Sequence, residues 1–561
     1  MKKVKSNARL VLTALSSIVL LTSCFQDNGV NMKPISEQQR TDEIASGDPS
    51  LSKYNPPIEL TFVRETGGLD DLLKQFPGET LEDNRWSRLY EQELGVQIKY
   101  DWVAQGDQYR QKLGFALATG KIPDIVRVNA QQLRQLSNAG LIQDLSDVYV
   151  KYASPFTKSI LSQEGNGPFE AATVDGKLMG IPESSSSIEG AEYLWIRTDW
   201  LDNLGLQPPR TMEDLLAISK AFTEGDPDRN GKNDTFGLAV TNYIWDPVAG
   251  LMDFMAGYGA YPNLWLKNAS GSLVYGGIQP EVKKALKALQ ELYGDGQIDS
   301  EFAMMDGRKV KSEVAKGKIG IAYGEQWSSF WLQPSRENPK AQWQAFPIVS
   351  ISGQQTKVPL PFNTSQYLAV RKGYEHPEAI VKLINLHLEK NWGATAEYQT
   401  YYSTPYPAWQ LSPVTPFPPK KNLEAYLQLD DARRTGNQSV LKDEAKAIQK
   451  NIDIYMAGNA NKDIGWGWER TYGPSGAFAI LDQYEKNNQL LYESFTGGPT
   501  ETMIEKQSIL NNLLFDTYIN IILGRPIEEF DRFVEEWLRL GGDSITIEVN
   551  QWLSNRGRNM K

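Results

Sequence analysis

A single cysteine most constrains how this chain can fold, because 561 residues with one cysteine cannot form an internal disulfide. Cys24 ends the tetrapeptide Leu-Thr-Ser-Cys, which follows a basic N-terminal stretch and the apolar run 10–21. A basic stretch, a short apolar run and small residues, in that order, are typical of a cleaved signal peptide. The run is shorter than the roughly 20 residues that a permanent membrane helix needs. The sequence therefore predicts a signal peptide over residues 1–23.

The tetrapeptide resembles the bacterial lipobox, which implies that Cys24 is diacylated and becomes the mature N-terminus. Two acyl chains anchor a protein stably on a membrane, whereas one chain alone is marginal. The alternative is an ordinary secretory cleavage site with an incidental cysteine. Residues 24–56 are polar and predict a flexible tether. We therefore expect a folded body that is lipid-anchored at the extracellular face of the cytoplasmic membrane.

The composition argues against several classes of function. The formal net charge is −11. All the charged residues of the predicted signal peptide are basic, so its cleavage would make the mature chain more acidic still. An acidic surface argues against nucleic acid as a partner. The histidines are His376 and His387 alone, which argues against a histidine-rich zinc site and against a Ser-His-Asp triad. The 15 Trp and 25 Tyr favour sugar binding, because an exposed aromatic ring stacks on the apolar face of a pyranose.

Strand and helix patterns alternate along the chain after the tether. This alternation predicts an α/β lobe with a largely parallel sheet. The pattern restarts after 180–182 with a strand at 194–197, and chains of this length usually divide, so we expect a second lobe. The first strand patterns lie at 58–63, 96–100 and 123–128, and the first helical patterns lie at 86–94, 106–119 (ending at Gly120) and 130–139.

The rest of the chain is richer in helical patterns. Asp199 and Thr211 are expected to cap helices 200–204 and 212–222, because their side-chain oxygens can accept the free N–H groups of a first turn. From 421 onward the chain is expected to be mostly helical. The remaining predicted helices span 280–293, 375–390, 439–456, 478–494, 500–523 and 526–540.

One motif has the spacing of an EF-hand calcium loop. Over 226–234, oxygen-bearing side chains occupy positions one, three, five and nine, with a glycine at position six. Gly237 replaces the usual glutamate at position twelve, so another ligand or water must complete the site. The alternative is an Asx- and Gly-rich surface loop that binds nothing. We predict a structural calcium ion held by Asp226, Asp228, Asn230, Asp234 and the backbone carbonyl of Lys232.

Aromatic and acidic residues point to two kinds of sugar chemistry. Trp466 and Trp468 are flanked by glycines and charged residues, an arrangement that exposes rings and supplies hydrogen bonds. Core packing is the alternative for each tryptophan. Two neighbouring carboxylates could instead hydrolyse a glycoside, but with 69 acidic residues such pairs also arise by chance. The carboxylates considered for that role are Glu192, Asp199, Glu325 and Glu469.

Several collinear segments together resemble the family-1 extracellular solute-binding proteins of ABC sugar importers. The resemblance is to the large lipoprotein subgroup of Gram-positive bacteria, which is similar to alginate-oligosaccharide-binding proteins. It covers nearly the whole chain, and it is more specific for the family than for the ligand. The matching segments are 121–125, 140–145, 176–182, 194–201 with 204–206 and Pro209, the loop 226–234, 316–320 and the tail 537–548.

The resemblance implies an α/β, two-lobed, periplasmic-binding-protein-like fold that is hinge-connected and has a helical C-terminal region. The first lobe would comprise 57–183 and about 363–430, and the second 184–362 and about 431–561. The resemblance also implies a monomeric receptor, not an enzyme, that closes on an oligosaccharide and delivers it to the importer's permease subunits. The alternatives are an extracellular glycan-active enzyme and a non-transport adhesin or regulatory lipoprotein.

We expect the ligand to bind near the lobe crossings and on aromatic loops, because open α/β sheets bind ligands at the carboxyl ends of their strands. A chain of this size favours an oligomeric or uronic-acid-bearing sugar over a monosaccharide. The residues predicted to contact the ligand are Arg64, Glu65, Thr66, Glu183, Ser184, Trp245, Asp246, Glu325, Trp327, Trp466, Trp468 and Arg470.

Overall fold

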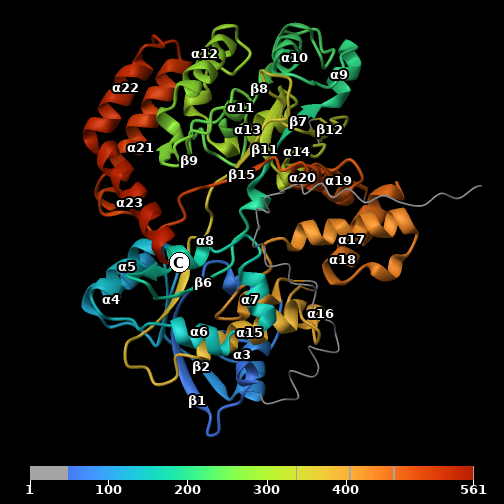
Figure 1. Ribbon diagram of the computed structural model, residues 1–561. Coiled ribbons are helices and arrows are strands. Elements are labelled where there is room, and N and C mark those ends of the chain that lie inside the picture. The colour runs from blue at the N-terminus through green and yellow to red at the C-terminus, as the bar shows by residue number, and fades with distance from the viewer. Residues whose placement is uncertain (1–47, 336–337, 404–405, 459–461, 560–561) are drawn as a thin grey trace, which may run out of the picture. The chain divides into compact units, whose positions relative to one another are not determined.

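The computed structural model describes residues 48–335, 338–403, 406–458 and 462–559 (Figure 1). Cys24, the predicted signal peptide 1–23 and residues 24–47 of the predicted tether lie outside the described residues. Within the described ranges, no helix combines the length and the apolar character that crossing a membrane requires.

Buried apolar side chains form two separate clusters, and the first gathers residues from Leu60 to Ile181 and from Tyr367 to Val414. We call this part the N-lobe. Its strands are β1 (Ile58–Glu65), parallel to β2 (Val96–Ala104), and β14 (Tyr367–Val370), which is antiparallel to β3 (Ile125–Val128) and to β6 (Ile181–Pro182). Its helices include α3 (Arg85–Leu89), α4 (Gly106–Thr119), α5 (Ala130–Asn138), α8 (Gly167–Ala171) and α15 (Ala379–Trp392).

The second cluster gathers residues from Ile188 to Leu360 and from Leu423 to Val549, and we call this part the C-lobe. Its helical C-terminal region runs from orange to red in Figure 1. Its main sheet has the order β12-β7-β11-β8, with β7 (Glu192–Arg197), β8 (Phe236–Leu238), β11 (Ile319–Glu325) and β12 (Trp343–Phe346). Its helices include α9 (Thr198–Leu204), α10 (Met212–Glu224), α11 (Met252–Ala256), α12 (Pro280–Gly294), α13 (Gly307–Ala315), α14 (Ser329–Leu332), α17 (Lys421–Thr435), α18 (Asp443–Met456), α19 (Lys462–Tyr472), α20 (Ala477–Lys486), α21 (Glu501–Ile522), α22 (Glu529–Trp537) and α23 (Asp543–Asn559).

Local sequence signals place several helices correctly. Helix α4 ends where the sequence predicts, because Gly120 adopts the left-handed conformation (φ 68°) that closes a helix without steric cost. The predicted cap of α10 is also confirmed. The Thr211 hydroxyl accepts the N–H of Asp214 (3.1 Å), and the Asp214 carboxylate accepts the N–H of Thr211 (3.0 Å).

The expectation of a largely parallel sheet in the first lobe holds for β1 and β2 but is wrong for the sheet of β3, β14 and β6. In the N-lobe, β14 is antiparallel to both its neighbours, and in the C-lobe β7 is antiparallel to β11 and β12. The reason lies in the chain path. Strands that return from later in the sequence are inserted into each sheet, so the local alternation of strand and helix does not fix strand direction.

Two smaller expectations are also wrong. Asp199 does not cap α9. Its carboxylate instead binds the guanidinium of Arg197 at 2.8 and 2.5 Å, because that guanidinium is buried and requires a charged partner. The helix predicted over 478–494 ends at Lys486. Asn488 then takes a positive φ of 52°, and β15 (Leu490–Tyr492) pairs in parallel with β13 (Val358–Leu360).

The folded body begins before the end of the predicted tether. Residues 49–54 lie against α15, where the Lys382 ammonium donates to the Ser52 carbonyl (2.8 Å) and the Asn385 amide donates to the Ser50 carbonyl (2.9 Å). The hydroxyl of Tyr54 also donates to Glu378 (2.8 Å). Polar composition predicted a flexible segment here, but backbone carbonyls met by side chains from α15 order it.

In the described residues the chain passes between the clusters at 182–187, 361–366 and 415–422. The first two crossings lie near the positions that the sequence indicates. The third lies earlier than the sequence boundary at about 430, because Leu423, Tyr426 and Leu429 of α17 are buried in the C-lobe cluster. We therefore infer that α17 belongs to the C-lobe.

Candidate functional site

Charged and polar side chains meet at the carboxyl end of β1 and beside β3. Arg127 of β3 makes a two-pronged ion pair with Glu183, with 2.7 Å from Nε to Oε2 and 2.7 Å from Nη2 to Oε1. Glu65 ends β1 and accepts the N–H of Gly106 at the start of α4 (2.9 Å). Burial raises the pKa of Tyr109, and the charges of Arg127, Glu65 and Glu183 also act on it, so the four groups lie together. We call Glu65, Tyr109, Arg127 and Glu183 the N-lobe patch.

The other three N-lobe residues in the predicted ligand set are engaged within the protein. Arg64 donates to the hydroxyl of Tyr100 (2.8 Å) and to two backbone carbonyls of the short helix 408–411. Thr66 is buried and donates to a carbonyl of β2 (3.4 Å). The Ser184 hydroxyl accepts a backbone N–H from the third crossing segment (3.1 Å). Their polar groups are therefore satisfied without a ligand.

Aromatic and charged side chains gather at the carboxyl end of β11. The indole Nε1 of Trp327 donates to the Glu325 carboxylate (2.5 Å). The Nζ atom of Lys311 on α13 lies 5.2 Å from the ring centre of Trp327, and its charge acts on Asp246. The ring of Trp245, beside Asp246 in sequence, packs against aromatic side chains of α21. We call these five residues the C-lobe patch.

The three predicted ligand residues on α19 pack inside the C-lobe. Trp466 is 3 % exposed, and the guanidinium of Arg470 stands over its ring at 5.3 Å from the ring centre. Arg470 also pairs with Glu469 and donates to a backbone carbonyl of β12 (2.9 Å). Trp468 packs edge to face on a phenylalanine of α14. The glycines that flank these tryptophans allow close packing, which is the alternative that the sequence left open.

Both patches lie at the sheet ends where the chain crosses between the lobes. Glu183 stands at the first crossing, and its N–H bonds to the carbonyl of Gln366 at the second crossing (3.0 Å). Glu325 is the cross-strand partner of Glu192, which opens β7 directly after the first crossing. A ligand that touched both patches would therefore bridge the lobes beside their connections.

Two buried carboxyl groups lie next to the C-lobe patch. Glu192 on β7 and Asp253 on α11 are 4 % and 0 % exposed, and each of the two carboxyl groups affects the titration of the other. Burial holds the pKa of Glu192 well above its ordinary value, and the charge of Asp253 raises it further. Burial also raises the pKa of Asp253 to about 7. The pair therefore keeps a proton at neutral pH, and burial raises the pKa of the neighbouring Glu325 as well.

The predicted calcium loop has the internal hydrogen bonds of an EF-hand-like turn. The Asp226 carboxylate accepts the backbone N–H groups of Asn230 and Gly231, both at 3.0 Å. The Asn230 amide donates to Asp228 (2.8 Å) and to Asp234 (3.1 Å). Burial and the charges of Asp226 and Asp234 raise the pKa of Asp228, so a cation would relieve their repulsion.

Ion binding in this loop would require some rearrangement. The described residues contain no group of three or more His, Cys, Asp or Glu side chains close enough to hold a metal ion. The donor types and the turn fit calcium, and the carboxylates would have to draw together around the ion.

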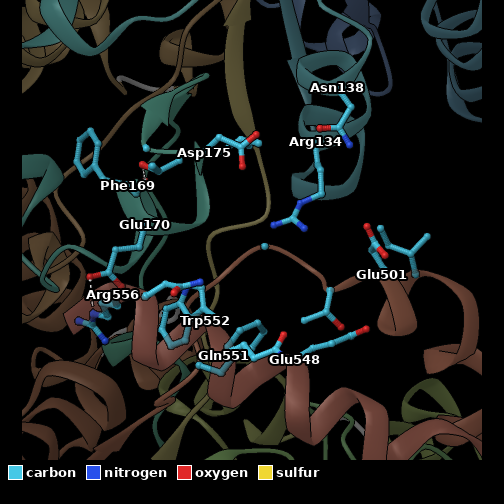
Figure 2. Close-up of a pocket in the computed structure, with 18 of the residues that line it drawn as sticks. Arg134, Asn138, Phe169, Glu170, Asp175, Glu501, Glu548, Gln551, Trp552 and Arg556 are labelled. Atoms are coloured by element: carbon cyan, nitrogen blue, oxygen red, sulfur yellow. Dashed lines mark hydrogen bonds and ion pairs between the residues drawn. The ribbon is translucent and has the colours of Figure 1, made fainter. Parts of the chain in front are cut away.

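A cavity of about 1120 Å³ lies elsewhere, between α5 and α8 of the N-lobe and α21 and α23 of the C-lobe (Figure 2). Arg134 points into it from α5, and α23 contributes Trp552 and several polar side chains. One of the dashed lines in Figure 2 marks the ion pair between Glu170 of α8 and Arg556 of α23 (2.9 Å from Oε1 to Nε). None of the residues that the sequence predicts to contact a ligand lines this cavity.

Sequence reasoning missed three members of the patches. Arg127 carried a usable signal, because a charged residue inside the apolar strand 125–128 needs a partner such as Glu183. Tyr109 and Lys311 carried none, since both lie in helices with many polar residues. Only the packing of α4 and α13 against their sheets distinguishes them.

Comparison with known proteins gives one consistent relationship. The family model described as bacterial extracellular solute-binding protein matches residues 67–400. The polygalacturonan/rhamnogalacturonan-binding protein YtcQ of Bacillus subtilis (strain 168) is 31% identical over 466 residues, which cover 81% of this chain and 85% of YtcQ. Lipoprotein LipO of the same organism is 26% identical over 482 residues, which cover 82% of this chain and 87% of LipO.

Solved structures share the two-lobed fold that the sequence implied. One is the Streptococcus pneumoniae ABC-transporter substrate-binding protein FusA, an EF-hand mutant in complex with fructo-nystose. It aligns with a TM-score of 0.56 and 17% identity, over 90% of this chain and 100% of FusA. At that identity the likeness shows the fold alone.

Proposed function

The chain belongs to the bacterial extracellular solute-binding proteins, and on that basis we propose that it captures an oligosaccharide for an ABC importer. The observation that carries this proposal is the pair of patches, one in each lobe and both beside the lobe connections. YtcQ is named for polygalacturonan and rhamnogalacturonan, and FusA, which is 26% identical over 42% of this chain, is named for fructooligosaccharide, so both relatives support a sugar ligand.

In this proposal, the ligand acts by bridging the lobes. Trp327 and Trp245 offer ring faces to a sugar, and the N-lobe patch offers Tyr109 and charged groups for its hydroxyls. Contacts made with both lobes favour the closed arrangement over the open one, because only the closed arrangement satisfies them together. The importer's permease subunits would then receive the closed form from a monomeric receptor that Cys24 tethers to the membrane.

The carboxylates considered for glycoside hydrolysis support binding over catalysis. Asp199 and Glu469 are paired with Arg197 and Arg470. Glu192 is buried against Asp253, and only Glu325 lies at the C-lobe patch. At the C-lobe patch, Glu325 accepts the indole N–H of Trp327 and Asp246 accepts the N–H of Val248, so both carboxylates are engaged within the protein.

We also propose that the 226–234 loop holds a structural calcium ion. The turn geometry, the donor set and the mutual repulsion of three aspartates support it. The ion would fix the connection between α10 and β8 in a chain that has no internal disulfide.

The direct test is calorimetric titration of the full-length protein with a panel of oligosaccharides, with mass spectrometry of the sugars afterwards. We expect one glycan class to bind without being cleaved. Trp327→Ala should weaken that binding about tenfold or more, since a buried aromatic anchor contributes more than about 1.4 kcal/mol.

Trp552→Ala is the matched variant for the cavity of Figure 2, and it should leave the affinity within about twofold. If Trp552→Ala weakened binding and Trp327→Ala did not, the ligand site would be that cavity instead. A cleaved product would establish an enzyme, and a panel without any binding would favour an adhesin.

A further inference from the structure

The cations near the two patches are mostly occupied by the protein itself. Arg64 donates to the Tyr100 hydroxyl and to backbone carbonyls. Arg127 is bound on two atoms by Glu183, and Arg470 is bound by its neighbour Glu469. None of these guanidinium groups has a free pair of N–H donors for a ligand carboxylate.

Lys311 is different. Among the described residues, its ammonium group has no ion pair and no hydrogen bond, whereas Lys309 and Lys316, its neighbours on and just after α13, both pair with Glu313 (3.2 and 3.0 Å). The Nζ atom of Lys311 lies over two indole rings instead, 5.2 Å from the centre of Trp327 and 5.8 Å from that of Trp331. Ring faces hold an ammonium group in place without neutralising its charge.

The acidic residues beside Lys311 are already satisfied. The Asp246 carboxylate accepts the N–H of Val248 (2.9 Å), and Glu325 accepts the indole N–H of Trp327. Burial raises the pKa of both carboxyl groups. A positive group, an aromatic face and engaged carboxylates therefore lie side by side at the end of β11.

We propose that Lys311 recognises the carboxylate of an acidic, uronic-acid-bearing oligosaccharide while Trp327 stacks on a sugar ring. This inference rests on the proposed function and names its substrate class. A carboxylate would gain a charge-assisted hydrogen bond with a cation that two ring faces hold in position and that forms no ion pair among the described residues. A neutral sugar would gain only an ordinary hydrogen bond from the same ammonium group.

The test compares two ligands that differ in one charge per residue: trigalacturonate and its methyl ester. Calorimetry on the full-length protein should show tighter binding of the acid. Lys311→Met keeps the apolar stem of the side chain and removes the charge. It should weaken trigalacturonate binding about tenfold or more and leave methyl ester binding within about twofold.

Lys309→Met is the matched control on the same helix, and it should leave both affinities unchanged; circular dichroism should show all variants folded. The inference is overturned if Lys311→Met weakens both ligands equally or neither, or if the wild-type protein binds a neutral oligosaccharide and not trigalacturonate. A wild-type protein that binds no oligosaccharide at all overturns the proposed function instead, and this inference with it.

Discussion

The backbone of β11 passes directly against two aromatic rings at Gly320. A Cβ atom there would lie 2.3 Å from Phe222 and 2.6 Å from Trp200, and both rings are fully buried. Neither ring can move far, because they pack edge to face on each other with centres 5.2 Å apart. A strand that carries part of the C-lobe patch is therefore positioned by a residue that has no side chain.

We expect Gly320→Ala to lower the free energy of unfolding by about 1–3 kcal/mol or more, through overpacking. Urea unfolding measures this directly. Gly114→Ala in α4 is the matched control: no atom lies within 4 Å of its added Cβ, so it should raise stability by about 0.5–1 kcal/mol. Equal effects of the two substitutions would contradict the packing argument.

The buried pair of Glu192 and Asp253 should make stability depend on pH. Burial favours the protonated forms, so the folded protein keeps protons that the unfolded chain releases near pH 4. The stabilisation is therefore complete at low pH and is lost as pH rises through about 7, the folded pKa of Asp253. The charged neighbours Glu325 and Asp246 act in the same direction on Glu192.

Between about pH 5 and pH 8.5 the free energy of unfolding of the wild type should fall. We expect that of Asp253→Asn to fall by about 1–2 kcal/mol less. Urea unfolding across this range measures the difference. Asp516→Asn, which changes an exposed carboxylate on α21, serves as the control and should follow the wild-type curve. An Asp253→Asn curve parallel to the wild type would exclude a raised pKa of Asp253 in the folded protein.

At the scale of elements, the turn between α10 and β8 is held by its own acidic side chains. Calcium that binds only the folded state stabilises it by about 2.7 kcal/mol at a hundred times its dissociation constant. We therefore expect the melting temperature of the full-length protein to rise on adding calcium and to fall with EGTA. Asp228→Asn keeps the hydrogen-bonding shape but removes one charge, so it should reduce the calcium response.

Asp202→Asn, an exposed change on the neighbouring helix α9, is the control for this loop. It should retain the full calcium response. If neither calcium nor EGTA changed the melting temperature of the wild type, the loop 226–234 would be an Asx- and Gly-rich turn that binds no ion.

At the scale of the whole molecule, two separate cores are joined by three crossings in the described residues. Each lobe carries its own patch at the crossing end of its sheet, so ligand contacts with both patches would couple the lobes. Small-angle X-ray scattering should show a smaller radius of gyration in saturating oligosaccharide.

Tyr109→Ala removes an N-lobe contact and should give weaker binding and a smaller decrease in the radius of gyration. Phe115→Ala lies on the same helix, at a side chain that is 69 % exposed, and should behave as the wild type. If Tyr109→Ala bound the oligosaccharide with wild-type affinity and showed the full decrease in the radius of gyration, the N-lobe patch would not be part of the ligand site.

The sequence by itself determined the local elements and the family. Helix α4 with Gly120, the cap of α10 and the loop 226–234 are set by residues a few positions apart, so they can be read from one stretch of chain. The collinear motifs of a solute-binding protein gave the two-lobed fold for a similar reason: each motif is a local pattern, and their order along the chain identifies the family.

Only the tertiary structure decided strand direction, the lobe of α17 and the use of each charged side chain. The sequence predicts that Arg64 and Arg470 contact the ligand, but Arg64 donates to a carbonyl 346 residues away, and Arg470 pairs with its neighbour Glu469 and donates to a carbonyl 127 residues away. Nothing in the sequence distinguishes Lys311 from other helical lysines, but two tryptophans hold its ammonium group, which forms no ion pair among the described residues. Contacts between distant segments depend on how the lobes pack, and no local pattern records them.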